Sequence, residues 1–228
     1  MKTISFVFIC LASTLLIANA FAQTAGSAYW ALNSTTQQTV ANFGDLVGSD
    51  QTISAGPIPD ISVYDYDASG QRIWASNPIP STYGWLAAPE HAAKYLEFNA
   101  APAAGNSATI LGVQFKYGAA NLDGFIASNV YYSTNGWSTR TQLNTTGELT
   151  YPANGMSNFL KIFSIAVPVA VGETFSLRIY PYALQNAVAA MPTFAVHSSV
   201  VFRAMTTAVR TGTVSGTKFN SGESGTET

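Results

Sequence analysis

Strict alternation of apolar and polar side chains is the feature that most constrains the fold of this chain. In the stretch TFSLRIYPY at 174–182 the apolar positions alternate with polar ones: Phe175, Leu177 and Ile179 against Ser176, Arg178 and Tyr180. A period of two residues is typical of a β-strand, because successive side chains point to opposite faces of a sheet. The stretch therefore predicts a strand with one buried face. Its second face, with Arg178, Tyr180 and Tyr182, is either solvated or a contact surface.

Similar stretches lie along the whole chain, at 28–33, 61–67, 94–100, 110–118, 125–133, 159–167 and 193–205. In 110–118 the alternation places Leu111 on the same face as Val113, Phe115 and Tyr117. The stretch 159–167 is apolar on both faces, which predicts a strand in the middle of a sandwich. Asn135-Gly136, after 125–133, predicts a two-residue hairpin turn. Together these strands predict an all-β chain, an antiparallel β-sandwich of the jelly-roll type.

The two ends of the chain differ in composition from the part between them. Residues 1–22 carry Lys2, then an apolar run, then Ala20-Phe21-Ala22, which is the pattern of a secretory signal peptide. Residues 211–228 are almost entirely Gly, Ser, Thr and charged residues, which predicts a flexible tail. The expected organisation is a signal peptide at 1–22, one β-sandwich domain at 23–210 and the tail. The predicted location is extracellular or at the cell surface.

Bulk composition excludes several classes of protein. The only cysteine, Cys10, lies in the predicted signal peptide, so the exported chain has no disulfide, no thiolate nucleophile and no cysteine metal ligand. Charged residues make up only 10%, against about 25% in typical soluble domains, and the net charge is −2. Without a basic stripe, nucleic-acid binding is not expected. No later apolar run has the length of a membrane span. The expected partners are a neutral polymer or copies of the same chain.

Sequence motifs give little support for catalysis. His91 and His197 stand outside any zinc-binding pattern, no G-x-S-x-G elbow is present, and the twelve carboxylates are scattered. We therefore expect no enzymatic activity, although two carboxylates of a hydrolase or lyase can still meet in space. In DYDASG, Asp65 and Asp67 resemble the front of a calcium loop, and the alternative is a polar turn. The expected cofactor is none, or a structural calcium ion.

Several of these segments together resemble one family. They are YWAL, VYDYDASGQRIW, KYLEFNAAPAAGNSATILGVQFKYG, NVYYSTNGWSTRTQLN and GETFSLRIYPY, which cover most of 28–205. In order and spacing they are similar to the jelly-roll, carbohydrate-binding-like module of secreted bacterial polysaccharide-degrading proteins, the type often found beside pectate lyase domains. The resemblance implies a jelly roll, a structural calcium ion in many members, and an accessory role in binding polysaccharide.

Aromatic and polar side chains suggest how such binding would work. Sugar rings stack on aromatic planes through their C–H faces, and their hydroxyls bond to polar side chains. The residues expected to form this face are Arg178, Tyr180, Tyr182, Tyr132 and Trp137. The alternative for each aromatic is packing in the core or over a sheet edge. We predict a secreted, non-catalytic module that binds extracellular polysaccharide. The alternative is a self-assembling subunit of an extracellular fibre, sheath or matrix.

Overall fold

The computed structural model describes residues 22–33, 40–54, 61–67, 70–75, 92–93, 95–120, 125–145, 149–152, 159–183 and 193–209. The predicted tail at 211–228, and all of the predicted signal peptide except Ala22, lie outside the described residues. Within the described part, no helix is long and apolar enough to cross a membrane.

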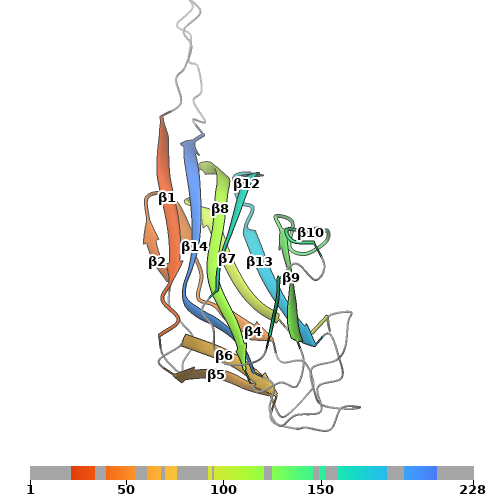
Figure 1. Ribbon diagram of the computed structural model, residues 1–228. Coiled ribbons are helices and arrows are strands. Elements are labelled where there is room, and N and C mark those ends of the chain that lie inside the picture. The colour runs from red at the N-terminus through yellow and green to blue at the C-terminus, as the bar shows by residue number, and fades with distance from the viewer. Residues whose placement is uncertain are drawn as a thin grey trace, which may run out of the picture.

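The described residues form strands and no helix, which confirms the all-β prediction (Figure 1). The long strands are β1 (Gln23–Trp30), β5 (Ile61–Asp67), β6 (Gly70–Ala75), β7 (Tyr95–Pro102), β8 (Asn106–Ala120), β9 (Phe125–Ser133), β12 (Phe159–Val169), β13 (Phe175–Ala183) and β14 (Thr193–Ala208). The short strands are β2 (Val40–Phe43), β3 (Leu46–Gly48), β4 (Thr52–Ser54), β10 (Thr141–Gln142) and β11 (Leu149–Pro152).

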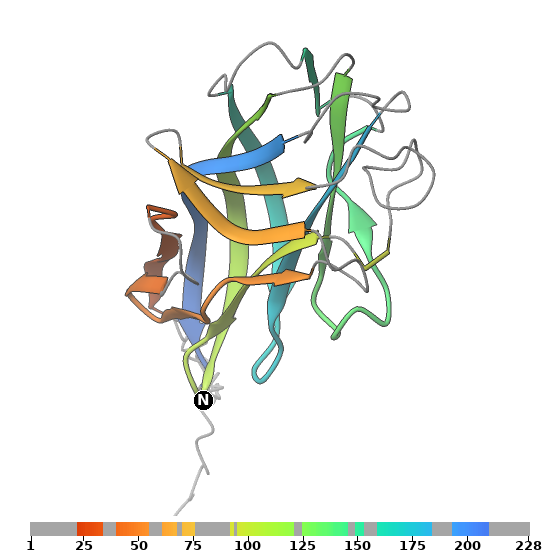
Figure 2. The ribbon, with the colours of Figure 1, turned by 90° about the horizontal axis from the view of Figure 1, so that it is seen from below.

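These strands form two antiparallel sheets. Sheet A has the order β12-β8-β14-β1-β2, with β6 on β14 and β5 on β6; sheet B has the order β10-β9-β13-β7-β3, with β11 on β9 and β4 on β7. From β7 to β14 the successive long strands alternate between the two sheets, and each new strand inserts beside an earlier one, which is the connectivity of a jelly roll. The predicted β-sandwich is therefore confirmed. Strands β5 and β6 lie across one end of it (Figure 2).

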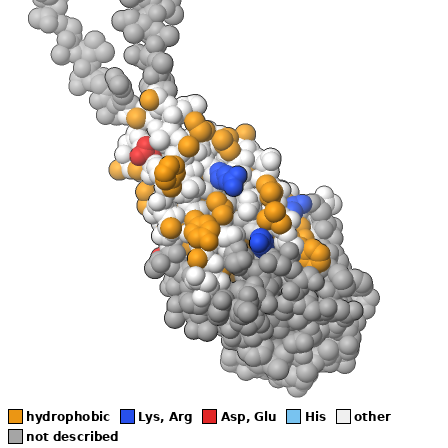
Figure 3. Space-filling model, turned by 60° about the vertical axis from the view of Figure 1, so that its left-hand side comes forward, with side chains coloured by type: hydrophobic (Ala, Val, Ile, Leu, Met, Phe, Trp, Pro, Cys, Tyr) orange, Lys and Arg blue, Asp and Glu red, His pale blue; other side chains and the backbone are white. Residues whose placement is uncertain are grey.

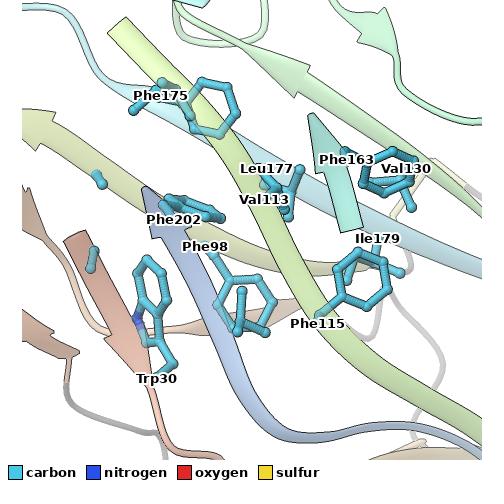
Figure 4. Packing of buried hydrophobic residues seen from close by; sticks show 14 of the residues in the cluster. Trp30, Phe98, Val113, Phe115, Val130, Phe163, Phe175, Leu177, Ile179 and Phe202 are labelled. Carbon is cyan, nitrogen blue, oxygen red and sulfur yellow. The ribbon is translucent and has the colours of Figure 1, made fainter. Parts of the chain in front are cut away.

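Between the sheets lies one apolar core built from the inward faces of both (Figure 4). Trp30 of β1 is fully buried, with its ring edge-on to Phe98 and Phe202 at centroid distances of 5.3 and 4.9 Å. Its indole N–H donates to the carbonyl of Ser49 at 2.9 Å, so the polar atom of this large side chain is satisfied. Phe175 of β13 packs edge-on to Phe202 at 5.2 Å, which links sheet B to sheet A.

The prediction that 159–167 forms a central strand is wrong. β12 occupies one edge of sheet A, where it pairs with β8 alone among the described strands. Phe163 and Val167 face the core, whereas Leu160 and Ile162 point outward and are 53% and 55% exposed. An apolar pattern on both faces does not distinguish a buried strand from one whose outer face is apolar and exposed.

The alternation predicted for 110–118 is also interrupted. Val113, Phe115 and Tyr117 lie in the core as expected, but Leu111 is 43% exposed. The pairing of β8 with β14 skips this residue, since Arg203 pairs with Gly112 and the next residue of β14 pairs with Ile110. Leu111 is thus the extra residue of a β-bulge, and such a bulge reverses the side on which the following residues lie.

Candidate functional site

The second face of β13 is a contact surface within the protein. Arg178 pairs with Glu97 of β7 on one side and with Tyr131 of β9 on the other, so three side chains form one row across the outer face of sheet B. The next row joins Ser176 to Asn99 and Ser133. Because residues opposite one another in antiparallel strands lie on the same face, these two rows bring six charged and polar positions together.

Arg178 is the centre of this face. Its Nε donates to Glu97 Oε2, and Nη1 donates to the hydroxyl of Tyr180 at 3.4 Å. Its Cζ lies 3.9 Å from the ring centroid of Tyr95 and 4.0 Å from that of Trp137. Tyr95 contacts Tyr180, whereas Trp137 lies toward Ser176, so the two rings approach Arg178 from opposite directions along β13. The guanidinium is held by one carboxylate, one phenol and two aromatic faces.

The surroundings of Arg178 stabilise its charged form. Burial by itself lowers the pKa of Arg178, but its hydrogen bonds to Tyr180 and Glu97, together with the negative charge of Glu97, raise it above the ordinary value. The side chains of Arg178 and Glu97 are 19% and 13% exposed. The two charges therefore form a largely buried, mutually neutralising pair.

A tightly bonded loop places Trp137 against Arg178. Ser133 Oγ accepts hydrogen bonds from the backbone N–H groups of Asn135 and Trp137, at 3.3 and 3.0 Å. Gly136 and Trp137 have φ angles of 66° and 67°. The left-handed region is natural for glycine but costs a bulky residue about 1–2 kcal/mol. Tryptophan is held here against its backbone preference, which is a feature of functional sites.

This loop corrects the hairpin prediction. Asn135-Gly136 is not a two-residue turn, since seven residues, 134–140, connect β9 to β10. The tight turn inside the loop is centred on Gly136 and Trp137 and closes with a hydrogen bond from the N–H of Ser138 to the carbonyl of Asn135. The turn thus lies one residue later than predicted, and the Asn135 side chain donates to the hydroxyl of Thr139 and accepts from its backbone N–H.

Beside Trp137 the surface is hollowed into a groove of about 480 Å³. One wall is β3 with Ser49, the other is Gly136 and Trp137, and the floor carries Glu97, Asn99 and Ser176. The volume falls within the range of about 300–1,000 Å³ that is usual for ligand pockets. Trp137 Nε1 and Asn99 Oδ1 are buried, and neither has a hydrogen-bond partner among the described residues. The groove therefore combines an aromatic side chain and a few polar ones with a lining that is otherwise apolar, including Val47, Ala100 and Ala101.

The structure separates the five predicted site residues. Arg178, Tyr180 and Trp137 are brought together, although Tyr180 is only 2% exposed. Tyr182 lies on the same side of β13 but is also buried. Tyr132 belongs to the opposite face, where its ring stacks on Phe175 at a centroid distance of 5.6 Å and packs against the core. Of the aromatics in this set, Trp137 is the one that lines the groove.

Sequence reasoning missed Tyr95, Glu97 and Asn99, although a signal for them was present. In YLEFNA these residues alternate with Leu96, Phe98 and Ala100, which face the core. Their face is therefore set by the alternation, but the pairing that puts them beside Arg178 depends on strand order. Sequence reasoning also missed Arg140, which lies in the loop between β9 and β10. Its Cζ is 4.0 Å from the ring centroid of Tyr131.

The calcium prediction remains untested. Asp65 and Asp67 lie in β5, where they pair with Arg72 and Gly70 of β6, and their side chains are outside the described part of the structure. Among the described residues, no group of three or more His, Cys, Asp or Glu side chains is placed to hold a metal ion.

Comparisons with known proteins give no family. No protein-family model matches the chain, and no curated protein matches it. Among solved structures it is similar to the structure of infectious bursal disease virus Gt strain, with a TM-score of 0.32 and 11% identity over 85% of this chain and 57% of that one. For the Gx strain the TM-score is 0.24, with 14% identity over 86% of this chain and 57% of that one. The chain thus spans less than two thirds of either structure's length, and likenesses this weak support no functional argument.

Proposed function

We propose that this chain is an exported, non-catalytic module that binds an extracellular polysaccharide in the groove beside Trp137. The observation that carries the proposal is the position of Trp137 itself. Its backbone is held at a φ of 67°, its ring contacts the Arg178 guanidinium, and it walls a groove with a polar floor. Strain of this kind persists only where the surrounding structure imposes it.

The groove has the two elements that sugar recognition needs. An aromatic ring offers an apolar plane to the C–H face of a sugar, and Arg178 behind it keeps that ring fixed in place. Glu97, Asn99 and Ser176 offer polar atoms on the floor, where sugar hydroxyls donate and accept hydrogen bonds. A pre-formed arrangement loses little side-chain entropy on binding.

Affinity electrophoresis tests this proposal. The mature chain is run through gels that contain members of a polysaccharide panel, beside Trp137→Gly and Tyr29→Ala variants. Glycine accepts the φ of Trp137, and Tyr29 is an aromatic residue, 41% exposed, on the outer face of sheet A. We expect retardation of the wild type and of Tyr29→Ala, and its loss in Trp137→Gly. Equal retardation of all three proteins would show that the polymer binds at another site. If no polymer retards the folded wild type, the proposal is wrong.

A second candidate is the self-assembling subunit, because the outer face of sheet A carries several exposed apolar side chains. Leu111, Leu160 and Ile162 are about half exposed there, next to a hollow of about 270 Å³ lined also by Gly112 and Arg203. Viewed from the β1–β2 side, hydrophobic side chains stand in patches between isolated basic ones (Figure 3). β12 is moreover an eleven-residue edge strand, and long apolar edges favour pairing with another chain.

Sedimentation velocity and negative-stain microscopy over a concentration series test this candidate. We expect an assembling chain to be dispersed by Ile162→Lys and not by Val171→Lys, which alters an equally exposed apolar residue outside the strands. A monodisperse wild type at high concentration would remove the candidate.

A further inference from the structure

We infer that the groove beside Trp137 selects uncharged glycans and rejects those that carry uronate carboxylates. This inference rests on the proposed function and names the class of ligand. It comes from the distribution of charge around the groove. Arg178 lies nearby and suggests a site for anions, but the charged residue that lines the groove is Glu97.

The Glu97–Arg178 ion pair presents its negative partner to the groove. Glu97 is the charged residue among the described residues that line it, whereas Arg178 lies behind this lining. A carboxylate that enters the groove therefore meets the negative partner of this pair first, and like charges at short range disfavour it.

Arg178 is poorly placed to offset this repulsion. A guanidinium binds a carboxylate best through two parallel N–H donors. In Arg178 the Nε donor is given to Glu97 and the Nη1 donor to Tyr180, and Tyr95 and Trp137 occupy its two flanks. Arg178 is not among the residues that line the groove, and a uronate that took its Nε donor would leave the Glu97 carboxylate largely buried without its partner.

Hydroxyl groups fit the same floor better. Asn99 Oδ1 accepts and Trp137 Nε1 donates, and both atoms lack a partner among the described residues. A hydroxyl is a donor and an acceptor at once, so a sugar hydroxyl can pair with either of these two atoms. A carboxylate can accept from the indole but has nothing to donate to the amide carbonyl.

Matched pairs of polymers test the inference. The mature chain is run through gels containing hydroxyethyl cellulose, β-1,4-galactan or highly methyl-esterified polygalacturonate. Beside each runs the same polymer with C6 carboxylates, made by oxidation of the first two and de-esterification of the third. At low salt we expect the uronate form to bind at least about tenfold more weakly, and added salt to narrow the difference.

A Glu97→Gln variant assigns the effect to one residue. It keeps the shape of the side chain and removes the charge, so we expect discrimination between the paired polymers to fall below about threefold. Its folding is checked by its urea midpoint. If the uronate form binds as tightly as the uncharged form, or if Glu97→Gln discriminates like the wild type, the inference fails while the proposed function stands. If neither form of any polymer binds, the proposed function itself fails.

Discussion

Replacing Arg178 tests the central contact of the outer face of sheet B. The designed changes are Arg178→Met, Glu97→Gln and the two combined. Methionine keeps an unbranched, flexible side chain between Tyr95 and Trp137, and glutamine keeps the shape of Glu97. The double variant leaves neither residue charged.

The expected loss of stability in each variant follows from how deeply the ion pair is buried. Exposed ion pairs contribute about 0–1 kcal/mol, and removing one partner of a fully buried pair costs about 3–5 kcal/mol. Because the Arg178 and Glu97 side chains are 19% and 13% exposed, the cost of removing one partner of this pair should lie between those limits. The contacts with two aromatic rings add about 0.5–1 kcal/mol each. We expect Arg178→Met to lower the free energy of unfolding by about 3 kcal/mol and Glu97→Gln to lower it by about 1–2 kcal/mol.

Urea unfolding at pH 7, followed by tryptophan fluorescence and circular dichroism, gives the free energies of unfolding of the wild type, the two single variants and the double variant. Together these four values form a double-mutant cycle. We expect the double variant to be more stable than the sum of the two single changes implies, with a coupling energy of about 1–2 kcal/mol. Additive changes, with coupling below about 0.5 kcal/mol, would refute the argument that the two charges compensate each other in the folded protein.

Three further predictions follow from the backbone and the charges. Trp137→Gly should be more stable than Trp137→Ala by about 1 kcal/mol in urea unfolding, the reverse of the usual order, because φ at this residue is 67°; equal stability would contradict the conformation. Val113→Ala should cost about 1–3 kcal/mol and Leu111→Ala less than about 0.5 kcal/mol, because one faces the core and the other is 43% exposed; equal losses would argue against the bulge. The pKa of Arg178 is raised, so its contribution is fully present below its unfolded-state pKa and is lost only as pH rises through the folded-state pKa. The stability difference between wild type and Arg178→Met should then stay constant between about pH 6 and pH 10, and a decline in that range would contradict the assignment.

The positions and inward faces of the long strands could be predicted because alternation is a local property of the chain. The bounds of 61–67 and 125–133 coincide with β5 and β9, and the apolar face of 174–182 is the core face of β13. The short strands β2, β3, β4, β10 and β11 have two to four residues, too few for a period of two to be visible. Their place depends on the long strands with which they pair.

The candidate site was only partly predictable because it depends on which strands become neighbours. Arg178 and Trp137 were identified from residue type, but Glu97 and Tyr95 come from β7, which becomes the neighbour of β13 only in the folded sheet. Tyr132 was assigned to the wrong side of the sheet relative to Arg178. It pairs with Leu177, whereas its neighbour Tyr131 pairs with Arg178. One residue of register decides the face, and sequence alone does not give that register.

The position of β14 in sheet A bears on how the chain assembles in time. This strand, the last of the described elements, joins β1 to β8, and its residue Thr207 pairs with Gln23. Until residues 193–208 are free to fold, the pairs β1–β2 and β8–β12 of sheet A have no described strand that joins them. We therefore expect sheet A to close only after β14 has been synthesised, through contacts between segments far apart in the sequence, which is a slow route to the native state.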